Sequence, residues 1–316
     1  MKNDLRIAFM GTPEFAVASL RALLESGYSI PVVVTAPDRP AGRGRKLQPS
    51  AVKVFALQHG IEVLQPERLR DPDFLEQLKE HRINLQVVVA FRMLPREVWS
   101  LPQYGTFNLH ASLLPDYRGA APINWAVING ETRTGVTTFF IDEKIDTGNI
   151  ILQRETAIGP GESAGELHDR LMHLGAALVV ETVGRIAAGN LDTRAQKHLQ
   201  SSKQAPKLDR ENCRVAWTEP TGQLYNKIRG LSPYPGAWTF LEHGGDLNPV
   251  KLFKAAEAEI PEQGDPGQIR IKGHRWFAAT GNGWLEILEL QLPGKKKMAA
   301  REVLNGLELQ VTSRFL

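Results

Sequence analysis

Short apolar runs alternate with amphipathic segments over residues 1–190, and this alternation constrains the fold more than any other feature of the chain. A parallel sheet covered by helices produces such a pattern, because its buried strands are apolar throughout whereas each helix has one apolar stripe. The sequence therefore predicts an α/β domain with a Rossmann-like parallel sheet. The expected strands lie at 5–9, 30–34, 85–90, 106–110, 135–141 and 150–158.

The helices of this domain have recognisable ends. Thr12 and Ser50 can each cap a helix, and a long helix is predicted over 164–188. Gly11 follows the first strand, as a dinucleotide-binding glycine would. The segment Gly-Thr-Pro lacks the further glycines of that motif, so we expect Gly11 to form a tight turn instead.

The chain changes character beyond residue 190. Residues 191–207 are polar and show no apolar period, which indicates a linker between a domain at 1–190 and a second domain at 208–316. After a predicted helix at 218–230, short apolar segments are separated by Gly, Pro or Asn. This pattern is typical of a small antiparallel barrel, although a sandwich would produce it too.

Composition narrows the class of protein. The single cysteine, Cys213, excludes an intramolecular disulfide framework and a multi-cysteine zinc site. No apolar run approaches the roughly 20 residues that span a bilayer, and we expect a soluble, cytoplasmic and monomeric protein. The net charge is +3, and its surplus lies in residues 200–316. Solvated surface lysine is the more common explanation of such a surplus, and a polyanionic partner is the alternative.

Polar side chains follow two of the predicted strands. Asn108 and His110 stand two apart at the end of one strand, so they share a face. The strand in segment 136–148 leads to a loop that carries Asp146. An amide, an imidazole and a carboxylate at one sheet edge suit acyl transfer better than redox or metal chemistry. The alternative is a structural histidine beside an asparagine that stabilises a turn.

The segments Asn-Leu-His-Ala-Ser-Leu-Leu-Pro at 108–115 and Asp-Thr-Gly at 146–148 resemble those of formyltetrahydrofolate-dependent transferases. Within that superfamily, further segments resemble the methionyl-tRNA formyltransferase family, and the resemblance covers nearly the whole chain. These segments lie at 9–16, 37–44, 118–123 and 228–238.

The resemblance implies a formyltransferase catalytic domain at 1–190 and an OB-like, tRNA-binding β-barrel at 208–316. The implied reaction moves the formyl group of 10-formyltetrahydrofolate to the amino group of methionine on initiator Met-tRNA, without a metal. Another formyl-folate enzyme, acting on a sugar amine or glycinamide ribonucleotide or hydrolysing the cofactor, is the nearest alternative. A catalytically silent RNA-binding or folate-sensing protein would not need the three polar residues.

The resemblance also assigns roles to individual residues. Asn108 would donate to the developing oxyanion, His110 would donate to it or exchange protons, and Asp146 would orient the imidazole. Arg92 departs from the family pattern and either meets the folate glutamate tail or is a plain surface arginine. The expected folate-binding residues are Phe91, Arg92, Met93, Leu94, Ser112, Leu113, Leu114, Pro115, Ile141 and Asp142.

Residues 37–48 form a connection far longer than the usual two to six residues. The resemblance implies that this loop enters the acceptor stem of initiator tRNA, with Arg43 as the main recognition residue. A solvated, flexible loop is the alternative. The expected tRNA-binding residues are Arg39, Arg43, Arg45 and Lys46.

Overall fold

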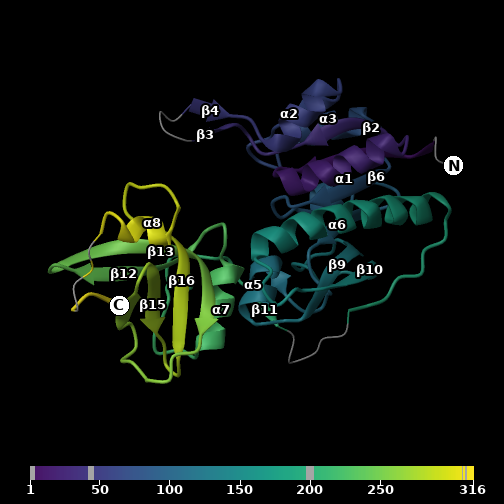
Figure 1. Ribbon diagram of the computed structural model, residues 1–316. Helices are drawn as coiled ribbons and strands as arrows, with labels where there is room; N and C mark the ends of the chain where they lie inside the picture. Colours follow the sequence, from purple (N-terminus) through teal and green to yellow (C-terminus); the bar gives the residue numbers. More distant parts are fainter. Residues whose placement is uncertain (1–3, 42–45, 197–202, 308, 310–311) are drawn as a thin grey trace. The chain divides into compact units, whose positions relative to one another are not determined.

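The computed structural model describes residues 4–41, 46–196, 203–307, 309 and 312–316 (Figure 1). Two compact units alternate along the chain. The first comprises Met1–Pro122, Thr134–Thr156 and His168–Gln204, and the second Ile123–Arg133, Ala157–Leu167 and Ala205–Leu316. Two segments from within 1–190, Ile123–Arg133 and Ala157–Leu167, pack with the second unit. The division of the chain into domains at 1–190 and 208–316 therefore stays a prediction.

A seven-stranded sheet forms the first unit, in the order β10-β9-β7-β6-β1-β2-β5. The strands from β7 to β5 in this order pair in parallel, and β9 is antiparallel to β7. The predicted Rossmann-like sheet is confirmed. Strand β5 was not predicted, because its three residues are too few to show an apolar period. The strands are β1 (Arg6–Gly11), β2 (Ser29–Val34), β5 (Glu62–Leu64), β6 (Leu85–Val89), β7 (Thr106–His110), β9 (Arg133–Phe140) and β10 (Ile150–Ala157).

Helices cover both faces of this sheet. Figure 1 shows α1 and α6 along one face, and buried side chains of α3 and α4 pack on the other. The Ser50 hydroxyl caps α2 by accepting a hydrogen bond from Lys53 N at 3.0 Å, as expected. The expected Thr12 cap is wrong, because Pro13 occupies the capping position and no side chain bonds to the first turn. The helices are α1 (Glu14–Glu25), α2 (Ala51–Gln58), α3 (Pro72–Glu80), α4 (Arg96–Trp99) and α6 (Ala164–Ala187).

Close packing, rather than turn geometry, requires glycine at position 11. Gly11 is the last residue of β1, and its φ angle lies outside the left-handed region. A Cβ there would lie 2.6 Å from the Cβ of Ala16, so the missing side chain lets α1 approach the strand. A Cβ at Gly175 of α6 would likewise lie 2.7 Å from Leu109 Cδ2.

The strand register decides which face carries the polar residues of β7. Asn108 pairs with Val88 on one side and with Phe139 on the other, so these side chains share a face. Val88 packs in the cluster that contains Phe74 of α3. Leu109 points to the opposite face, against α6. Asn108 and His110 therefore lie on the face away from α6.

The long connection at 37–48 contains a hairpin that its sequence did not predict. In it β3 (Arg39–Ala41) pairs antiparallel with β4 (Lys46–Gln48). Arg43 and Arg45 lie outside the described residues. At the base of the hairpin, Asp38 accepts hydrogen bonds from Lys53 Nζ at 2.7 Å and Gln65 Nε2 at 2.8 Å.

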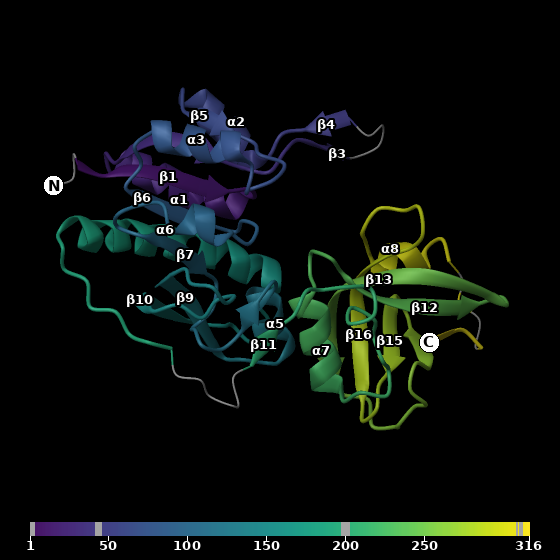
Figure 2. The same ribbon diagram turned by 180° about the vertical axis from the view of Figure 1, so that it is seen from behind.

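The second unit contains an antiparallel sheet in the order β14-β15-β16-β13-β12-β18, with β17 paired to β16. Figure 2 shows α7 and α8 against this sheet. The helix predicted at 218–230 is present, and the short apolar segments that follow it form strands. Their bounds are α7 (Thr221–Gly230), β12 (Ala237–His243), β13 (Asp246–Ala258), β14 (Ile269–Lys272), β15 (Arg275–Ala279), β16 (Trp284–Gln291), β17 (Met298–Ala299), α8 (Ala300–Leu304) and β18 (Arg314–Phe315). The remaining elements are α5 (Pro122–Ile128), β8 (Arg118–Gly119) and β11 (Gln204–Ala205), of which β8 and β11 pair.

The two edges of the antiparallel sheet meet. Gln268 bridges to Arg314, and Phe315 N donates a hydrogen bond to the Gly267 carbonyl at 2.8 Å. The Phe315 ring stacks on Trp276 with centroids 5.6 Å apart, inside the core of the unit. An antiparallel sheet with joined edges agrees with the predicted small barrel.

Arg229 of α7 connects this helix to the segment Ala157–Leu167 of the same unit. Its Nε donates to Asn226 Oδ1 at 2.8 Å, and its Nη1 donates to the Glu162 carbonyl at 2.7 Å. Burial lowers the pKa of Arg229. A buried guanidinium is tolerated here because carbonyl and amide oxygens accept hydrogen bonds from its N–H groups.

Candidate active site

Asn108 and His110 lie at the end of strand β7 and, as expected, share one face. Asn108 is half-buried, and in the described part of the chain its side-chain amide has no hydrogen-bond partner. His110 is buried, with 6% of its surface exposed. The strand therefore presents an amide that can donate to a ligand, beside an imidazole that is shielded from water.

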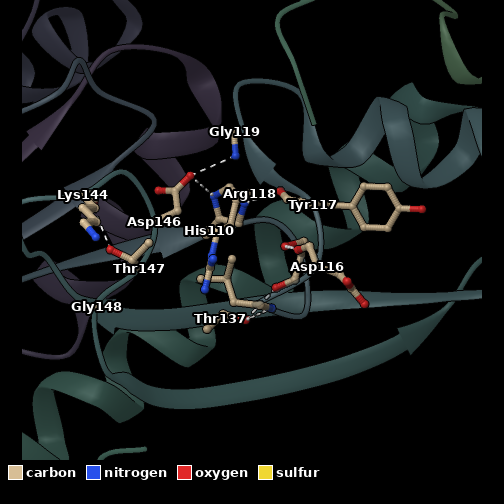
Figure 3. A network of polar contacts seen from close by, with 12 residues as sticks. His110, Asp116, Tyr117, Arg118, Gly119, Thr137, Lys144, Asp146, Thr147 and Gly148 are labelled. Atoms are coloured by element: carbon tan, nitrogen blue, oxygen red, sulfur yellow. Dashed lines mark hydrogen bonds and ion pairs between the residues drawn. The ribbon is translucent and has the colours of Figure 1, made fainter. Parts of the chain in front are cut away.

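The His110 ring is held at one nitrogen and faces a carboxylate with the other. Its Nε2 lies 2.8 Å from the Tyr117 carbonyl oxygen. A carbonyl oxygen only accepts hydrogen bonds, so Nε2 carries the proton. Nδ1 lies 3.8 Å from Asp146 Oδ2. Figure 3 shows the imidazole and the carboxylate facing one another. If Nδ1 takes up a proton, the resulting imidazolium of His110 therefore forms an ion pair with the Asp146 carboxylate.

The Asp146 carboxylate is held by the backbone of β8. Its Oδ2 accepts a hydrogen bond from Gly119 N at 3.0 Å (Figure 3). The backbone of Asp146 and that of Gly119 both have positive φ angles, 55° and 124° respectively. The value at Gly119 suits glycine, since other residues rarely adopt it. The carboxylate is thus fixed between an N–H group and the imidazole.

Tyr117, whose carbonyl orients His110, is itself in a strained conformation. Its φ angle is 59°, which is uncommon for a residue other than glycine. Tyr117 N donates to the Lys203 carbonyl at 2.6 Å, and Lys203 N donates to Asp116 Oδ1 at 3.1 Å. Lys203 lies in the polar segment that was predicted to be a linker. Because that segment has no apolar period, its sequence did not predict the hydrogen bonds of Lys203 with Tyr117 and Asp116.

A buried threonine holds the loop after β7. Thr137 Oγ1 donates to the Ser112 carbonyl at 2.6 Å and accepts from Leu114 N at 3.2 Å. Ser112 and Leu114 are buried, whereas Leu113 and Pro115 are half-buried. The predicted folate-binding residues of this loop therefore lie in a rigid segment directly beside His110.

The second predicted folate-binding segment follows β6. Phe91 and Arg92 are half-buried, Met93 is 74% exposed, and Leu94 is buried in the core. Arg92 Nη1 donates to the Glu67 carbonyl at 2.9 Å, and its Nη2 donates to the Pro66 carbonyl. Burial, and more weakly Arg39, lower the pKa of Arg92. The guanidinium is thus anchored to backbone rather than free at the surface.

Ile141 and Asp142 begin the loop that leads to Asp146. Ile141 is half-buried, and Asp142 is exposed. Asp142 Oδ1 accepts hydrogen bonds from Lys144 N at 3.0 Å and Thr147 Oγ1 at 2.8 Å, which closes the loop on itself. A Cβ at Gly148 would overlap the carbonyl oxygen at the end of β9, so glycine is required there.

The predicted tRNA-binding residues are only partly described. Arg39 is exposed in β3, and Lys46 begins β4. Across the described ranges, no group of three His, Cys, Asp or Glu side chains could hold a metal ion. Within those same ranges, no helix is long and apolar enough to cross a membrane.

Two family models match this chain. Residues 5–183 match the family described as formyl transferase, and residues 207–308 match its C-terminal domain. The chain therefore belongs to the formyl transferase family, which confirms the resemblance drawn from its motifs.

Individual relatives narrow the class further. The methionyl-tRNA formyltransferase of Flavobacterium johnsoniae is 53% identical over 306 residues, which cover 96% of this chain and 97% of that protein. The methionyl-tRNA formyltransferase of Bacteroides fragilis is 49% identical over 313 residues, covering 98% of this chain and 97% of that protein.

Solved structures share the fold at lower identity. An N-formyltransferase from Helicobacter canadensis, in complex with folinic acid and dTDP-3-aminofucose, has a TM-score of 0.65 at 20% identity and covers 93% of this chain and 100% of that chain. HypX from Aquifex aeolicus, in complex with tetrahydrofolic acid, has a TM-score of 0.65 at 20% identity and covers 96% of this chain and 47% of that chain.

Proposed function

We propose that this protein transfers the formyl group of 10-formyltetrahydrofolate to the amino group of methionine on initiator Met-tRNA, in the cytoplasm, for translation initiation. The observation that carries the proposal is the near full-length match, at about half identity, to proteins named methionyl-tRNA formyltransferase. The convergence of Asn108, His110 and Asp146 supports the same reaction.

Asn108 serves the first step of this reaction. The amine nitrogen attacks the formyl carbon, and negative charge develops on the formyl oxygen. The Asn108 amide donates a hydrogen bond to that oxygen, and this bond strengthens as the charge forms. A donor in such a position contributes about 3 kcal/mol to transition-state stabilisation. That Asn108 has no partner across the described residues makes its N–H groups available.

His110 and Asp146 serve the proton transfer. The attacking nitrogen loses a proton, and N10 of the folate gains one as its bond to the formyl carbon breaks. The Nε2 of His110 is committed to the Tyr117 carbonyl, so Nδ1 is the atom that exchanges protons. The Asp146 carboxylate, 3.8 Å away, stabilises the imidazolium that forms.

The substrate contacts follow the predicted assignments. The segments 91–94, 112–115 and 141–142 are proposed to line the folate site, because their backbone flanks the catalytic residues. Residues 39–46 of the hairpin and the OB-like domain at 208–316 are proposed to bind tRNA. The protein is proposed to act as a monomer, with residues 191–207 linking the catalytic domain at 1–190 to the tRNA-binding domain.

A transfer assay tests the function directly. Labelled 10-formyltetrahydrofolate is offered with initiator Met-tRNA, elongator Met-tRNA or free methionine in parallel reactions. We expect label on initiator Met-tRNA with clear preference over the other two acceptors. Equal formylation of free methionine would refute the tRNA substrate, and release of labelled formate without an acceptor would indicate a formyl-folate hydrolase.

A further inference from the structure

Gln196, which follows α6, joins two segments of the active site through its side-chain amide. Its Nε2 donates hydrogen bonds to the carbonyl oxygens of Asp146 at 3.0 Å and Gly148 at 2.8 Å. Its Oε1 accepts from Arg118 Nε at 3.1 Å and from Arg118 Nη2 at 2.6 Å. One half-buried side chain therefore connects the loop that carries Asp146 to β8, which carries Gly119.

These two segments determine where the carboxylate lies. Asp146 Oδ2 accepts from Gly119 N, and the same oxygen faces His110 Nδ1. A shift of β8 relative to the loop would change both distances together. Gln196 bonds to the side chain of Arg118, the residue directly before Gly119, and to the backbone carbonyl of Asp146. It thus links the two segments that carry the partners of this hydrogen bond.

The backbone of Asp146 shows why such support is needed. Its φ angle of 55° is unfavourable for a residue with a side chain, and such conformations persist where surrounding contacts over-determine them. Thr147 bonds to Asp142 and so closes the loop on itself. Gln196 instead ties the strained Asp146 carbonyl to a neighbouring segment.

We propose that Gln196 is a positioning residue, which keeps the Asp146 carboxylate aimed at His110 during formyl transfer. Gln196 touches no reacting atom, so its effect passes through Asp146. The proposal rests on the function proposed above. It extends the catalytic machinery into the segment 191–207, whose composition indicated a linker.

Two substitutions in the full-length protein separate the contacts of Gln196. Gln196→Ala removes all of them, whereas Gln196→Glu keeps the oxygen that Arg118 needs and removes the donor to Asp146 and Gly148. We expect both variants to lower kcat about tenfold while each KM, for formyl donor and for Met-tRNA, changes less than about twofold. Wild-type kcat in Gln196→Glu would overturn the proposal.

Asn84→Ala is a matched control at the other end of the sheet. Its amide also joins two backbone segments, accepting from Arg6 N at 2.8 Å and donating to the Asp4 carbonyl at 2.7 Å. This variant should lower the thermal stability and leave kcat unchanged. An equal loss of kcat in Asn84→Ala would show that any lost tether slows the enzyme and would overturn a specific role for Gln196.

A double variant tests whether the effect passes through Asp146. If it does, Gln196→Ala combined with Asp146→Asn should be no slower than Asp146→Asn alone, within about twofold. A further tenfold loss would overturn the proposal. Failure of the underlying function gives a different result, because the wild-type protein would then not formylate Met-tRNA.

Discussion

Nε2 of His110 lies 2.8 Å from the carbonyl oxygen of Tyr117, a residue seven positions along the chain. This contact assigns the proton of the neutral ring to Nε2 and leaves Nδ1 facing Asp146. The ring is thereby held by backbone on one side, and its chemistry is confined to the other. The strained conformation of Tyr117 and its bond to Lys203 are parts of the same arrangement.

Substitution of His110 distinguishes the two ring nitrogens. In His110→Gln the amide can still donate to the Tyr117 carbonyl, but no basic nitrogen replaces Nδ1. We expect kcat to fall at least about 100-fold, because general acid–base catalysis is lost, while the melting temperature stays close to that of the wild type. Single-turnover kinetics and thermal unfolding measure the two effects. Substantial turnover in His110→Gln would rule out proton exchange at Nδ1.

Asn108→Ala should lower kcat about 100-fold, since it removes one hydrogen-bond donor to the oxyanion. The KM for the formyl donor should change little, because the interaction forms mainly in the transition state. The side chain is half-buried and bonds to no described residue, so we expect little loss of folding free energy. A large rise in KM at constant kcat would indicate that Asn108 binds substrate instead.

Thr137→Val tests the support of the loop after β7. The substitution keeps the shape of the side chain but removes the hydroxyl that bonds to the Ser112 carbonyl and Leu114 N. Two buried polar groups lose their partner, which should cost about 2 kcal/mol of unfolding free energy and raise the Kd for folate several-fold. Chemical denaturation and fluorescence titration measure both. Thr137→Ser retains the hydroxyl and should behave nearly as wild type; equal losses in the two variants would contradict this role.

Arg229→Met should destabilise the second unit. It leaves the Glu162 carbonyl without its charged donor, at a cost of about 2 kcal/mol in unfolding free energy. The exposed Arg301 of α8 provides the control, and Arg301→Met should change the unfolding free energy by less than about 0.5 kcal/mol. Denaturant unfolding of the full-length variants compares the two. Equal stabilities would show that the buried hydrogen bonds of Arg229 contribute nothing.

Arg43→Leu tests the proposed tRNA loop. We expect formylation of Met-tRNA to fall more than about tenfold and the preference for initiator over elongator to shrink, while folate binding is unchanged. Lys46→Ala, if it contacts phosphate alone, should weaken both tRNAs equally and reduce the salt dependence. Parallel kinetics on the two tRNAs provide the comparison. Wild-type discrimination by Arg43→Leu would remove the loop from the recognition mechanism.

Local pattern was enough to predict much of the first sheet and the central pair of polar residues. The strands through residue 158 follow from apolar runs, and the shared face of Asn108 and His110 follows from the period of two along a strand. The Ser50 cap also depends on near neighbours in the chain. The Thr12 cap did not form, since α1 begins at Glu14 with Pro13 at the capping position.

The order of strands and helices, the family and the residue types at the end of β7 can all be read from the amino-acid sequence. The tertiary structure alone decided that Gly119 holds Asp146, that Tyr117 orients His110, and that Gln196 joins the two segments. These contacts involve backbone groups and left-handed conformations that no residue type specifies. In the folded chain, the polar segment 191–207, which resembles a linker in sequence, lies against the catalytic loops. Hydrogen bonds between residues far apart in the chain depend on packing rather than on local pattern.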